Sequence, residues 1–329
     1  MKRIFLITLV VIALSFSWSS SHADFYVISA GSRGVGTEIS QLPYTISTSG
    51  FYYIKKDLTS TGDGILINAD NVTVDIMGFS INGPESGGDG IVFENRTGIE
   101  VRNGIIKDFS SGIRGRTDGK ANKIIGVKFL SNGGYSINLR GRGHVVKDCI
   151  VADCGAYGIY LPDTGNIIIN NTVYNSHYYG IVAGPGSIIS GNTSYENESI
   201  GINVISGCTV IGNTVYLNDT AGIAMEYGNT VINNTAYKNN QLSDPSRGGI
   251  LVGGDGNLVK NNTCKDNNLN NIILSGSENS IEENLITGST NGINFQNTGN
   301  LYSNNRAAGN ATAYANTAGN TNGGGNVSF

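Results

Sequence analysis

The sequence contains few charged residues and few of the side chains that build metal centres. Only 14% of its 329 residues are charged, against ~25% in ordinary domains, and the formal net charge is −4. A chain without a basic excess lacks the composition of a nucleic-acid-binding protein. Three histidines and four cysteines, with no CxxC spacing, argue against a zinc site.

The chain is instead rich in glycine and asparagine. It has 47 glycines and 42 asparagines, and both residues are poor formers of helix interiors. The composition therefore excludes coiled coils and helical bundles. A hydrophobic content of 39% also excludes a disordered, highly charged chain.

The first 23 residues have the pattern of a secretory signal peptide. Met1-Lys2-Arg3 is a short positive region, residues 4–16 form an apolar run, and Ser21-His22-Ala23 is typical of a cleavage site. The apolar run is too short for a comfortable transmembrane helix. We therefore expect cleavage before Asp24 and an exported protein, periplasmic or extracellular, with no transmembrane anchor after the signal is removed.

The main signal in the sequence is an internal repeat. An isoleucine, most often preceded by glycine, recurs every 21 to 27 residues at Ile65, Ile91, Ile113, Ile137, Ile159, Ile181, Ile202, Ile223, Ile250, Ile272 and Ile293. The second residue after it is nearly always apolar, and a strand places both on one face. Coils stacked in this way bury a continuous core. The pattern predicts an all-β parallel β-helix of about eleven coils.

Asparagine forms a second column about halfway round each repeat. Its members are Asn171, Asn192, Asn213, Asn234, Asn262 and Asn284. Asparagine tolerates a left-handed backbone, and stacked side-chain amides can hydrogen-bond to each other. We therefore expect a corner of the solenoid at this column.

The Gly-Ile and Asn-Asn-Thr columns resemble the repeats of the pectin-lyase-like superfamily and of the NosD-type proteins within it. The resemblance covers about residues 62–305 and implies a single-stranded, right-handed parallel β-helix with three parallel sheets. It leaves activity open, because the superfamily holds lyases, hydrolases, epimerases, adhesins and binding proteins. Polysaccharide enzymes of this fold tend to work on the outer face of one sheet.

The repeat also predicts the organisation of the chain. Residues 1–23 are the signal peptide, 24–60 an N-terminal cap, 61–306 the β-helix and 307–329 a C-terminal cap or flexible tail. The ends need a cover because an open solenoid end is an unpaired sheet edge. A long repeat carries an insertion, Gln241 to Arg247, and turn insertions are places where repeat scaffolds put function.

Arginines gather on the outward positions next to the isoleucine column. Five of them fall in three neighbouring coils: Arg96, Arg114, Arg116, Arg140 and Arg142. Arginine binds carboxylate and sulfate groups bidentately, so a uronic-acid polymer is one expected ligand, with Tyr160 in the same outward column. The other interpretation is a solvated charged face, in which Glu94, Asp118 and Asp163 pair with the arginines.

Two aspartates and two tyrosine columns are further candidates. Asp63 and Asp89 precede Gly-Ile on successive coils, which suits a catalytic pair or a Ca²⁺ site but also ordinary turns. Tyr174, Tyr195, Tyr216 and Tyr237 repeat every 21 residues on the outside. They predict a ladder that stacks sugar rings or one that stacks on itself. Tyr135, Tyr157 and Tyr179 form the second column.

Catalytic signatures of the superfamily are mostly absent. The alginate-epimerase motif Asp-Pro-His-Asp is matched only by Asp244-Pro245-Ser246-Arg247, which lacks the histidine. His144 and His177 fall in different columns, and we expect both at the surface. Two histidines and two methionines in the mature chain make a poor copper site.

The four cysteines allow one disulfide within a turn. Cys149 and Cys154 are five residues apart and would bridge if their side chains face each other. Cys208 and Cys264 fall at different phases of the repeat, so we expect them to be free thiols.

The sequence therefore predicts an exported β-helix that binds a surface polymer, a glycan, without catalysis and without a cofactor. The alternative is a polysaccharide lyase or C5-epimerase acting on a uronate polymer. It would use Arg116, Arg140 or Arg142 as base and charge clamp, with Asp63, Asp89 and Asp244 as acids or Ca²⁺ ligands. A structural or adhesive solenoid is the second alternative.

Overall fold

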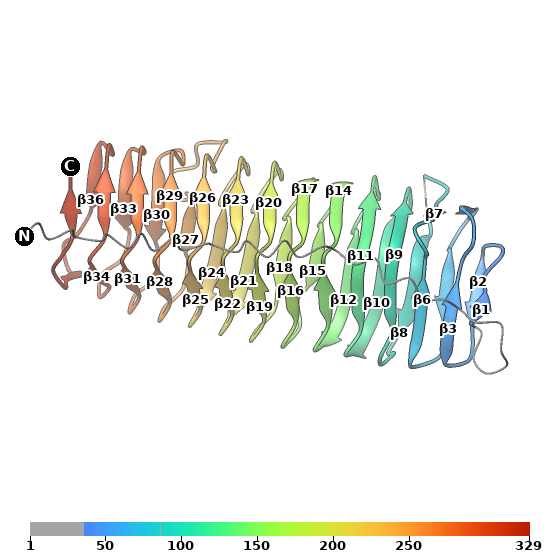
Figure 1. Ribbon diagram of the computed structural model, residues 1–329. Helices are drawn as coiled ribbons and strands as arrows, with labels where there is room; N and C mark the ends of the chain where they lie inside the picture. The colour runs from blue at the N-terminus through green and yellow to red at the C-terminus, as the bar shows by residue number, and fades with distance from the viewer. Residues whose placement is uncertain (1–35, 86) are drawn as a thin grey trace, which may run out of the picture. The chain divides into compact units, whose positions relative to one another are not determined.

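The computed structural model describes residues 36–85 and 87–329, and Gly36–Phe329 form one compact unit. The predicted signal peptide and the first part of the predicted N-terminal cap lie outside the described residues. The described residues contain strands, turns and bends but no helix, and hence no helix able to cross a membrane. Strands follow one another along this unit in the order of the sequence, as the colours show and as expected of a solenoid (Figure 1).

One sheet of the described unit takes one strand from each turn of the chain. Its thirteen parallel strands are β2 (Tyr44–Ile46), β5 (Ile65–Ile67), β8 (Asp89–Glu94), β10 (Ser111–Lys120), β12 (Ile137–Arg142), β15 (Ile159–Leu161), β18 (Ile181–Ala183), β21 (Ile202–Ser206), β24 (Ile223–Tyr227), β27 (Ile250–Val252), β30 (Asn270–Leu274), β33 (Asn291–Phe295) and β36 (Thr312–Ala315).

The other sheet of the described residues has 25 strands and consists of two parallel columns. The first column is β1 (Thr37–Glu38), β3 (Gly50–Tyr53), β6 (Val72–Asp75), β13 (Val145–Lys147), β16 (Ile167–Ile169), β19 (Ile188–Ser190), β22 (Thr209–Ile211), β25 (Thr230–Ile232), β28 (Leu258–Lys260), β31 (Ser280–Glu282), β34 (Leu301–Ser303) and β37 (Thr321–Asn322). The second is β4 (Leu58–Thr59), β7 (Ser80–Asn82), β14 (Ile150–Cys154), β17 (Thr172–Ser176), β20 (Thr193–Tyr195), β23 (Thr214–Tyr216), β26 (Thr235–Tyr237), β29 (Thr263–Lys265), β32 (Leu285–Thr287), β35 (Arg306–Ala308) and β38 (Val327–Ser328). The long strands β9 (Glu100–Lys107) and β11 (Lys123–Leu130) belong to both columns.

The all-β parallel β-helix is confirmed, but two details of the prediction are wrong. The described chain makes about thirteen turns rather than eleven, because β2 and β36 add one coil at each end. Neither strand has the Gly-Ile pair by which the coils were counted. The described residues form two sheets rather than the three expected. Strands β9 and β11 run through a corner and join the two columns by hydrogen bonds.

The isoleucine column stacks in register as predicted. Ile181, Ile202 and Ile223 pair directly from coil to coil, and their side chains are fully buried. The glycine before most of these isoleucines has a steric cause. A Cβ added to Gly201 would lie 2.7 Å from the carbonyl oxygen of Gly222 in the next coil. Glycine best allows so close an approach, although Ser136 and Asn271 precede Ile137 and Ile272.

The asparagine column is a continuous hydrogen-bonded ladder. The Asn192 side chain donates to Asn213 Oδ1 at 3.0 Å, Asn213 donates to Asn234 Oδ1 at 3.0 Å, and each amide also donates to a buried backbone carbonyl. The left-handed residue is not the stacked asparagine but the one before it. Asn233 has φ 58° before Asn234, and Gly212 has φ 65° before Asn213.

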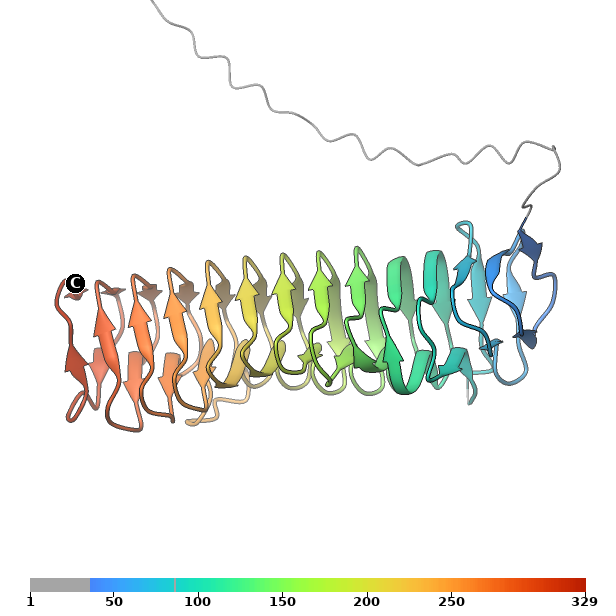
Figure 2. The same ribbon diagram turned by 90° about the horizontal axis from the view of Figure 1, so that it is seen from below.

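The two ends of the described unit also form coils. Residues 37–59 hold β1 to β4, and residues 312–328 hold β36 to β38, which pair with β33, β34 and β35. The insertion between β26 and β27 projects beyond the neighbouring turns, as both views show (Figures 1 and 2).

Candidate functional site

The outer face of the 13-stranded sheet is partly covered by its own side chains. Outward residues of the central strands are nearly buried, among them Val182, Ala224 and Leu251. Ala224, Leu251 and Ile273 form a small hydrophobic cluster with Ile200 and Ala221, separate from the core. Central coils therefore offer an apolar floor rather than a row of polar groups.

Two of the predicted arginines are held by an aspartate. Arg116 Nη2 lies 3.1 Å and Arg114 Nη1 3.6 Å from Asp89 Oδ2, and the Asp89 residue is only 4% exposed. The Asp63 carboxylate accepts a hydrogen bond from the backbone N–H of Asp89 at 2.7 Å. Each carboxylate therefore has a protein partner. No group of three or more His, Cys, Asp or Glu side chains placed to hold a metal occurs in residues 36–85 and 87–329.

Arg140 and Arg142 line a surface hollow of about 540 Å³, here called the arginine hollow, together with Asp118, Asp163 and Thr164. Arg140 lies over the Tyr160 ring at 5.4 Å and pairs with Asp163 at 3.8 Å. Asp163 also accepts the backbone N–H of Gly141 at 2.8 Å. Within the part of the chain that the structure describes, no carboxylate pairs with Arg142, which leaves this guanidinium free for an external anion.

Four tyrosines cluster next to the arginine hollow. The Tyr157 ring stacks on Tyr135 at 5.2 Å and on Tyr178 at 5.5 Å, and it meets the Tyr160 ring at 5.0 Å. Tyr178 is 49% exposed, so its outer surface is open to solvent. Together with Arg140 and Arg142 these tyrosines are called the Tyr/Arg face below.

The tyrosine column predicted from the sequence is only partly the one observed. Tyr135 and Tyr157 stack as expected, but Tyr178 takes the third place, and Tyr179 meets Tyr157 edge-on at 5.5 Å. The coil step stays at 22 residues, which aligns the backbone of Tyr179 with that of Tyr157, so Tyr178 joins the ring stack from the position beside it. Tyr160 joins the cluster from β15, which column spacing alone does not reveal.

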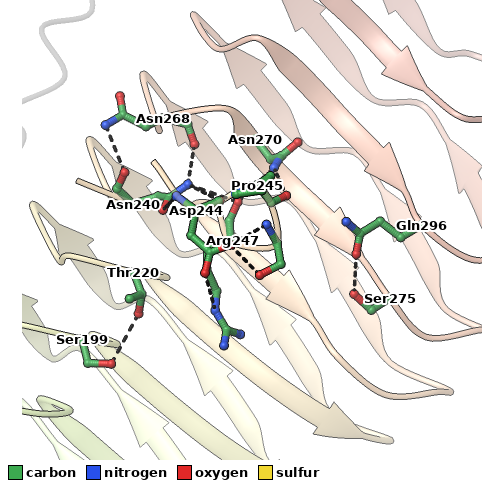
Figure 3. A network of polar contacts seen from close by, with 11 residues as sticks. Ser199, Thr220, Asn240, Asp244, Pro245, Arg247, Asn268, Asn270, Ser275 and Gln296 are labelled. Atoms are coloured by element: carbon green, nitrogen blue, oxygen red, sulfur yellow. Dashed lines mark hydrogen bonds and ion pairs between the residues drawn. The ribbon is translucent and has the colours of Figure 1, made fainter. Parts of the chain in front are cut away.

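The insertion between β26 and β27 is fixed in place by asparagines (Figure 3). Asn240 donates to the Asp244 carbonyl at 2.8 Å, and Asn270 donates to the carbonyls of Pro245 at 3.1 Å and Arg247 at 3.0 Å. The Asp244 carboxylate accepts hydrogen bonds from Ser246, and these lower the pKa of Asp244. Asp244 is thus held in its ionised form, which does not suit a general acid.

Arg247 of the insertion lines a second hollow of about 340 Å³ on the same sheet. Its other walls include Tyr179, Ile200, Asn203, Glu226 and Tyr227. The anchored loop therefore forms one wall of this hollow and contributes the Arg247 guanidinium to it. Glu226 is among the other lining residues. We call it the insertion hollow.

The predicted tyrosine ladder is confirmed as an aligned stack on the 25-stranded sheet. Tyr174, Tyr195, Tyr216 and Tyr237 have ring centroids 4.9, 4.7 and 4.8 Å apart and interplanar angles of 11°, 2° and 10°. Both faces of the two central rings are covered by neighbouring rings. Sugar rings therefore have no free face to stack on at Tyr195 and Tyr216, where only ring edges and hydroxyls remain for a ligand.

Sequence reasoning placed His144 wrongly and missed two further ladders. His144 is fully buried at a corner, where its Nδ1 accepts the Asn122 N–H at 3.3 Å and its Nε2 lies 3.1 Å from the Arg140 carbonyl. Burial lowers the pKa of His144. His177 is exposed, as expected, and lies 2.6 Å from Glu198. One missed ladder includes Asn122, His144 and Asn166, and the other includes Asn197, Asn218 and Asn239.

The four cysteines are free and buried. A Cys149–Cys154 bridge is absent because the two sulfurs point to different carbonyls. Cys149 Sγ lies 3.3 Å from the Lys147 oxygen, and Cys154 Sγ lies 3.7 Å from the Ala156 oxygen. Burial raises the pKa of the Cys149 thiol to about 12, so it is not a nucleophile.

Asp219 is a carboxyl group that the sequence analysis did not single out. Burial, and after it the charge of Glu198, raises the pKa of Asp219. Its backbone carbonyl accepts the N–H of Leu242 in the insertion at 3.0 Å. The signal was present, because His177, Glu198 and Asp219 follow each other at steps of 21 residues.

Comparison with known proteins supports the architecture. The sequence model of the family described as a right handed beta helix region matches residues 35–187 and 111–257. No curated protein matches the chain in a sequence search.

Solved structures of low identity share the fold. The A-module of the mannuronan C-5 epimerase AlgE6 from Azotobacter vinelandii has a TM-score of 0.67 and 16% identity, with 85% of this chain and 91% of that chain covered. DFA-IIIase from Arthrobacter chlorophenolicus A6, without its lid, has a TM-score of 0.65 and 13% identity, with 85% and 88% covered. The catalytic unit of a GH87 alpha-1,3-glucanase from Streptomyces thermodiastaticus has a TM-score of 0.61 and 14% identity, with 86% and 63% covered.

Proposed function

Because the chain belongs to the family of right-handed β-helix regions, we propose that it binds a glycan chain across the Tyr/Arg face without chemically changing it. The observation that carries the proposal is that the stacked tyrosines connect, through Tyr160 and Arg140, to the arginine hollow that Arg142 also lines. The similar folds include proteins whose names describe action on polysaccharides: a mannuronan epimerase and a glucanase.

The tyrosines supply an aromatic surface with polar edges. Tyr157 is covered on both sides by Tyr135 and Tyr178, which fixes the orientation of the group. Tyr178, half exposed, presents ring surface to solvent. Aromatic rings of this kind pack against the apolar faces of sugars, while the phenol hydroxyls hydrogen-bond at the rim.

The arginines give the site a preference for acidic groups. Arg114 and Arg116 are occupied by Asp89, and Arg140 is shared between Asp163 and the Tyr160 ring. Arg142 in the arginine hollow remains for a carboxylate or sulfate of the polymer. A planar guanidinium binds such groups bidentately.

The groups that catalysis would need are engaged elsewhere. Asp89 lies between two arginines, and Asp244 is held ionised by Ser246. His144 is buried in a corner ladder, out of reach of a polymer. These contacts favour binding without turnover.

A lyase or epimerase acting on a uronate polymer is the second candidate. It is favoured by the mannuronan epimerase fold and by Asp219, whose raised pKa suits a proton donor. Arg140 and Arg142 lie four coils, about 19 Å, from Asp219, so in this function they would hold a different sugar of the chain from the one that Asp219 protonates. Ca²⁺ would be needed only here, and Asp63 and Asp89 would be its first candidate ligands.

A panel of uronate-containing and neutral polysaccharides, with and without Ca²⁺, separates the two functions. Binding predicts retention of the protein without change in the polymer, and about tenfold weaker retention for Arg142→Ala, because a charge-assisted hydrogen bond is lost. Arg306→Ala, exposed on the other sheet, is the matched control. An unsaturated product, or a change in uronate composition that Asp219→Asn abolishes, would contradict binding without catalysis.

Location outside the cytoplasm is part of the same proposal. It is supported by the positive, apolar and small-residue pattern of residues 1–23, which lie outside the described residues. The periplasm and the extracellular medium both remain compatible with a glycan ligand.

A further inference from the structure

The tyrosine ladder belongs to a surface with no charge on its strands. The strands of the 25-stranded sheet from Ile167 to Tyr237 are β16, β17, β19, β20, β22, β23, β25 and β26, and none contains a charged residue. The strands before and after do, with Lys147 on β13 and Lys260 and Lys265 on β28 and β29. Four successive coils therefore have uncharged strands, with Glu196 and Lys238 at the corner that follows them.

Two rows of hydroxyl groups run along this window. Thr172, Thr193, Thr214 and Thr235 stack in register, each two residues before its tyrosine in the ladder of Tyr174, Tyr195, Tyr216 and Tyr237. We call these eight residues the Thr/Tyr strip. Within the described chain none of the eight hydroxyls has a hydrogen-bond partner in the protein. All eight side chains are partly exposed.

The stacking defines what a partner can touch. Ring centroids repeat every 4.7 to 4.9 Å and the ring planes are parallel, so the strip presents ring edges and a regular row of phenol oxygens. A partner therefore has to offer hydrogen-bonding groups along a line rather than a large apolar side chain. The phenol pKa values of Tyr195 and Tyr216 are raised by burial, so these hydroxyls stay protonated and able to donate.

The size of the strip argues against a second copy of the chain. Four coils and three-residue strands give roughly 15–20 Å by 10 Å, well below the ~800 Å² per partner of a stable protein interface.

We propose that the Thr/Tyr strip is a second carbohydrate-binding surface, which takes a neutral glycan chain lying along the axis of the coils. A neutral chain fits because no side chain of the strip carries a charge, and the adjoining corner holds one charge of each sign, Glu196 and Lys238. Sugar hydroxyls donate to and accept from the threonine and tyrosine oxygens. This surface lies on the other sheet and does not depend on the function proposed for the Tyr/Arg face.

The test is retention of the full chain on microcrystalline cellulose, chitin and insoluble mannan, as neutral probes. The variant Thr193→Val, Thr214→Val, Tyr195→Phe, Tyr216→Phe keeps the packing and removes four hydroxyls, and we expect its retention to fall about tenfold or more. Thr214→Lys places a charge in the strip and should have the same effect. Leu285→Lys, in the same column three turns beyond Thr214, is the matched control.

Tyr178→Ala on the Tyr/Arg face separates the two surfaces. It should leave retention on the neutral probes unchanged, whereas the strip variants should leave binding of a uronate polymer unchanged. Failure of every neutral probe, or retention that the strip variants do not alter, overturns the proposal. A concentration-dependent dimer in sedimentation that Thr214→Lys abolishes overturns it as well, because the strip would then be a contact between copies.

Discussion

Buried amides at the corners tie each coil to the next. Asn213 shows the pattern, since it accepts two hydrogen bonds from Asn192 and donates to Asn234 and to the Ile189 carbonyl. Such groups are favourable only when they are fully satisfied. His144 is a different residue type but makes the same kind of contact. It stands in a ladder between Asn122 and Asn166, and its Nδ1 is the acceptor.

We expect His144→Asn to remove a component of acid sensitivity. Protonated Nδ1 would face the Asn122 N–H, donor against donor, so burial and this contact disfavour the charged form. The pKa of His144 is therefore lower in the folded than in the unfolded protein. Below about pH 6.5 the unfolded chain binds a proton that the folded one does not. Stability from this residue is complete above that pH and is lost as the pH falls.

The measurement is the free energy of unfolding in urea between pH 8 and pH 5, for both proteins. At pH 8 the two values should agree within about 1 kcal/mol, because asparagine fills the same ladder position in neighbouring coils. Towards pH 5 the wild-type protein should lose more stability than the variant. Parallel pH profiles would contradict the role assigned to His144.

At the scale of the strand, glycine sets how closely coils approach. The Gly-Ile strands of the 13-stranded sheet require a residue without Cβ, since an added Cβ on Gly201 meets the Gly222 carbonyl oxygen at 2.7 Å. The same contact repeats at Gly222, where the oxygen of Gly249 is 2.6 Å away. The Gly-Ile repeat in the sequence therefore results from close backbone contact between successive turns.

Gly201→Ala should destabilise the protein by about 1–3 kcal/mol, as overpacking does in other rigid interiors. The Gly222 carbonyl accepts the Ile202 N–H at 2.9 Å and cannot move away without loss of this hydrogen bond. Gly62→Ala is the matched control, because nothing lies within 4 Å of its added Cβ. Urea unfolding followed by circular dichroism measures both. Equal midpoints for the two variants would refute the steric explanation of the Gly-Ile column.

A column of the solenoid can be predicted from the sequence where every coil needs the same residue type, and is hidden where several residue types fill it. The isoleucine column and the Asn171 ladder repeat one residue type, and both were predicted. The corner ladder through His144 also contains Ser187 and Cys208, so no single residue type repeats along it. Strands β2 and β36 lack the Gly-Ile pair and were not counted. The meeting of Tyr160 with Tyr157 depends on side-chain direction across a turn, which column spacing does not contain.

In the described unit as a whole, the two sheets have outer surfaces of different chemistry. The 13-stranded sheet carries the Tyr/Arg face, the arginine hollow and the insertion hollow, with charges of both signs. The 25-stranded sheet carries the uncharged Thr/Tyr strip. A solenoid allows this because each column of side chains can change without disturbing the core. The central claim is that an acidic glycan occupies the first of these surfaces.

Hydroxyl-radical footprinting with mass spectrometry tests that claim most directly, since it reports the solvent exposure of individual tyrosines. With a uronate polymer bound, we predict that oxidation of Tyr178 falls at least about threefold, because a glycan packed on the ring excludes water from it. Tyr195 and Tyr216 should remain unchanged, and Arg142→Ala should weaken the protection. Protection of the tyrosine ladder with Tyr178 still fully reactive would contradict the account.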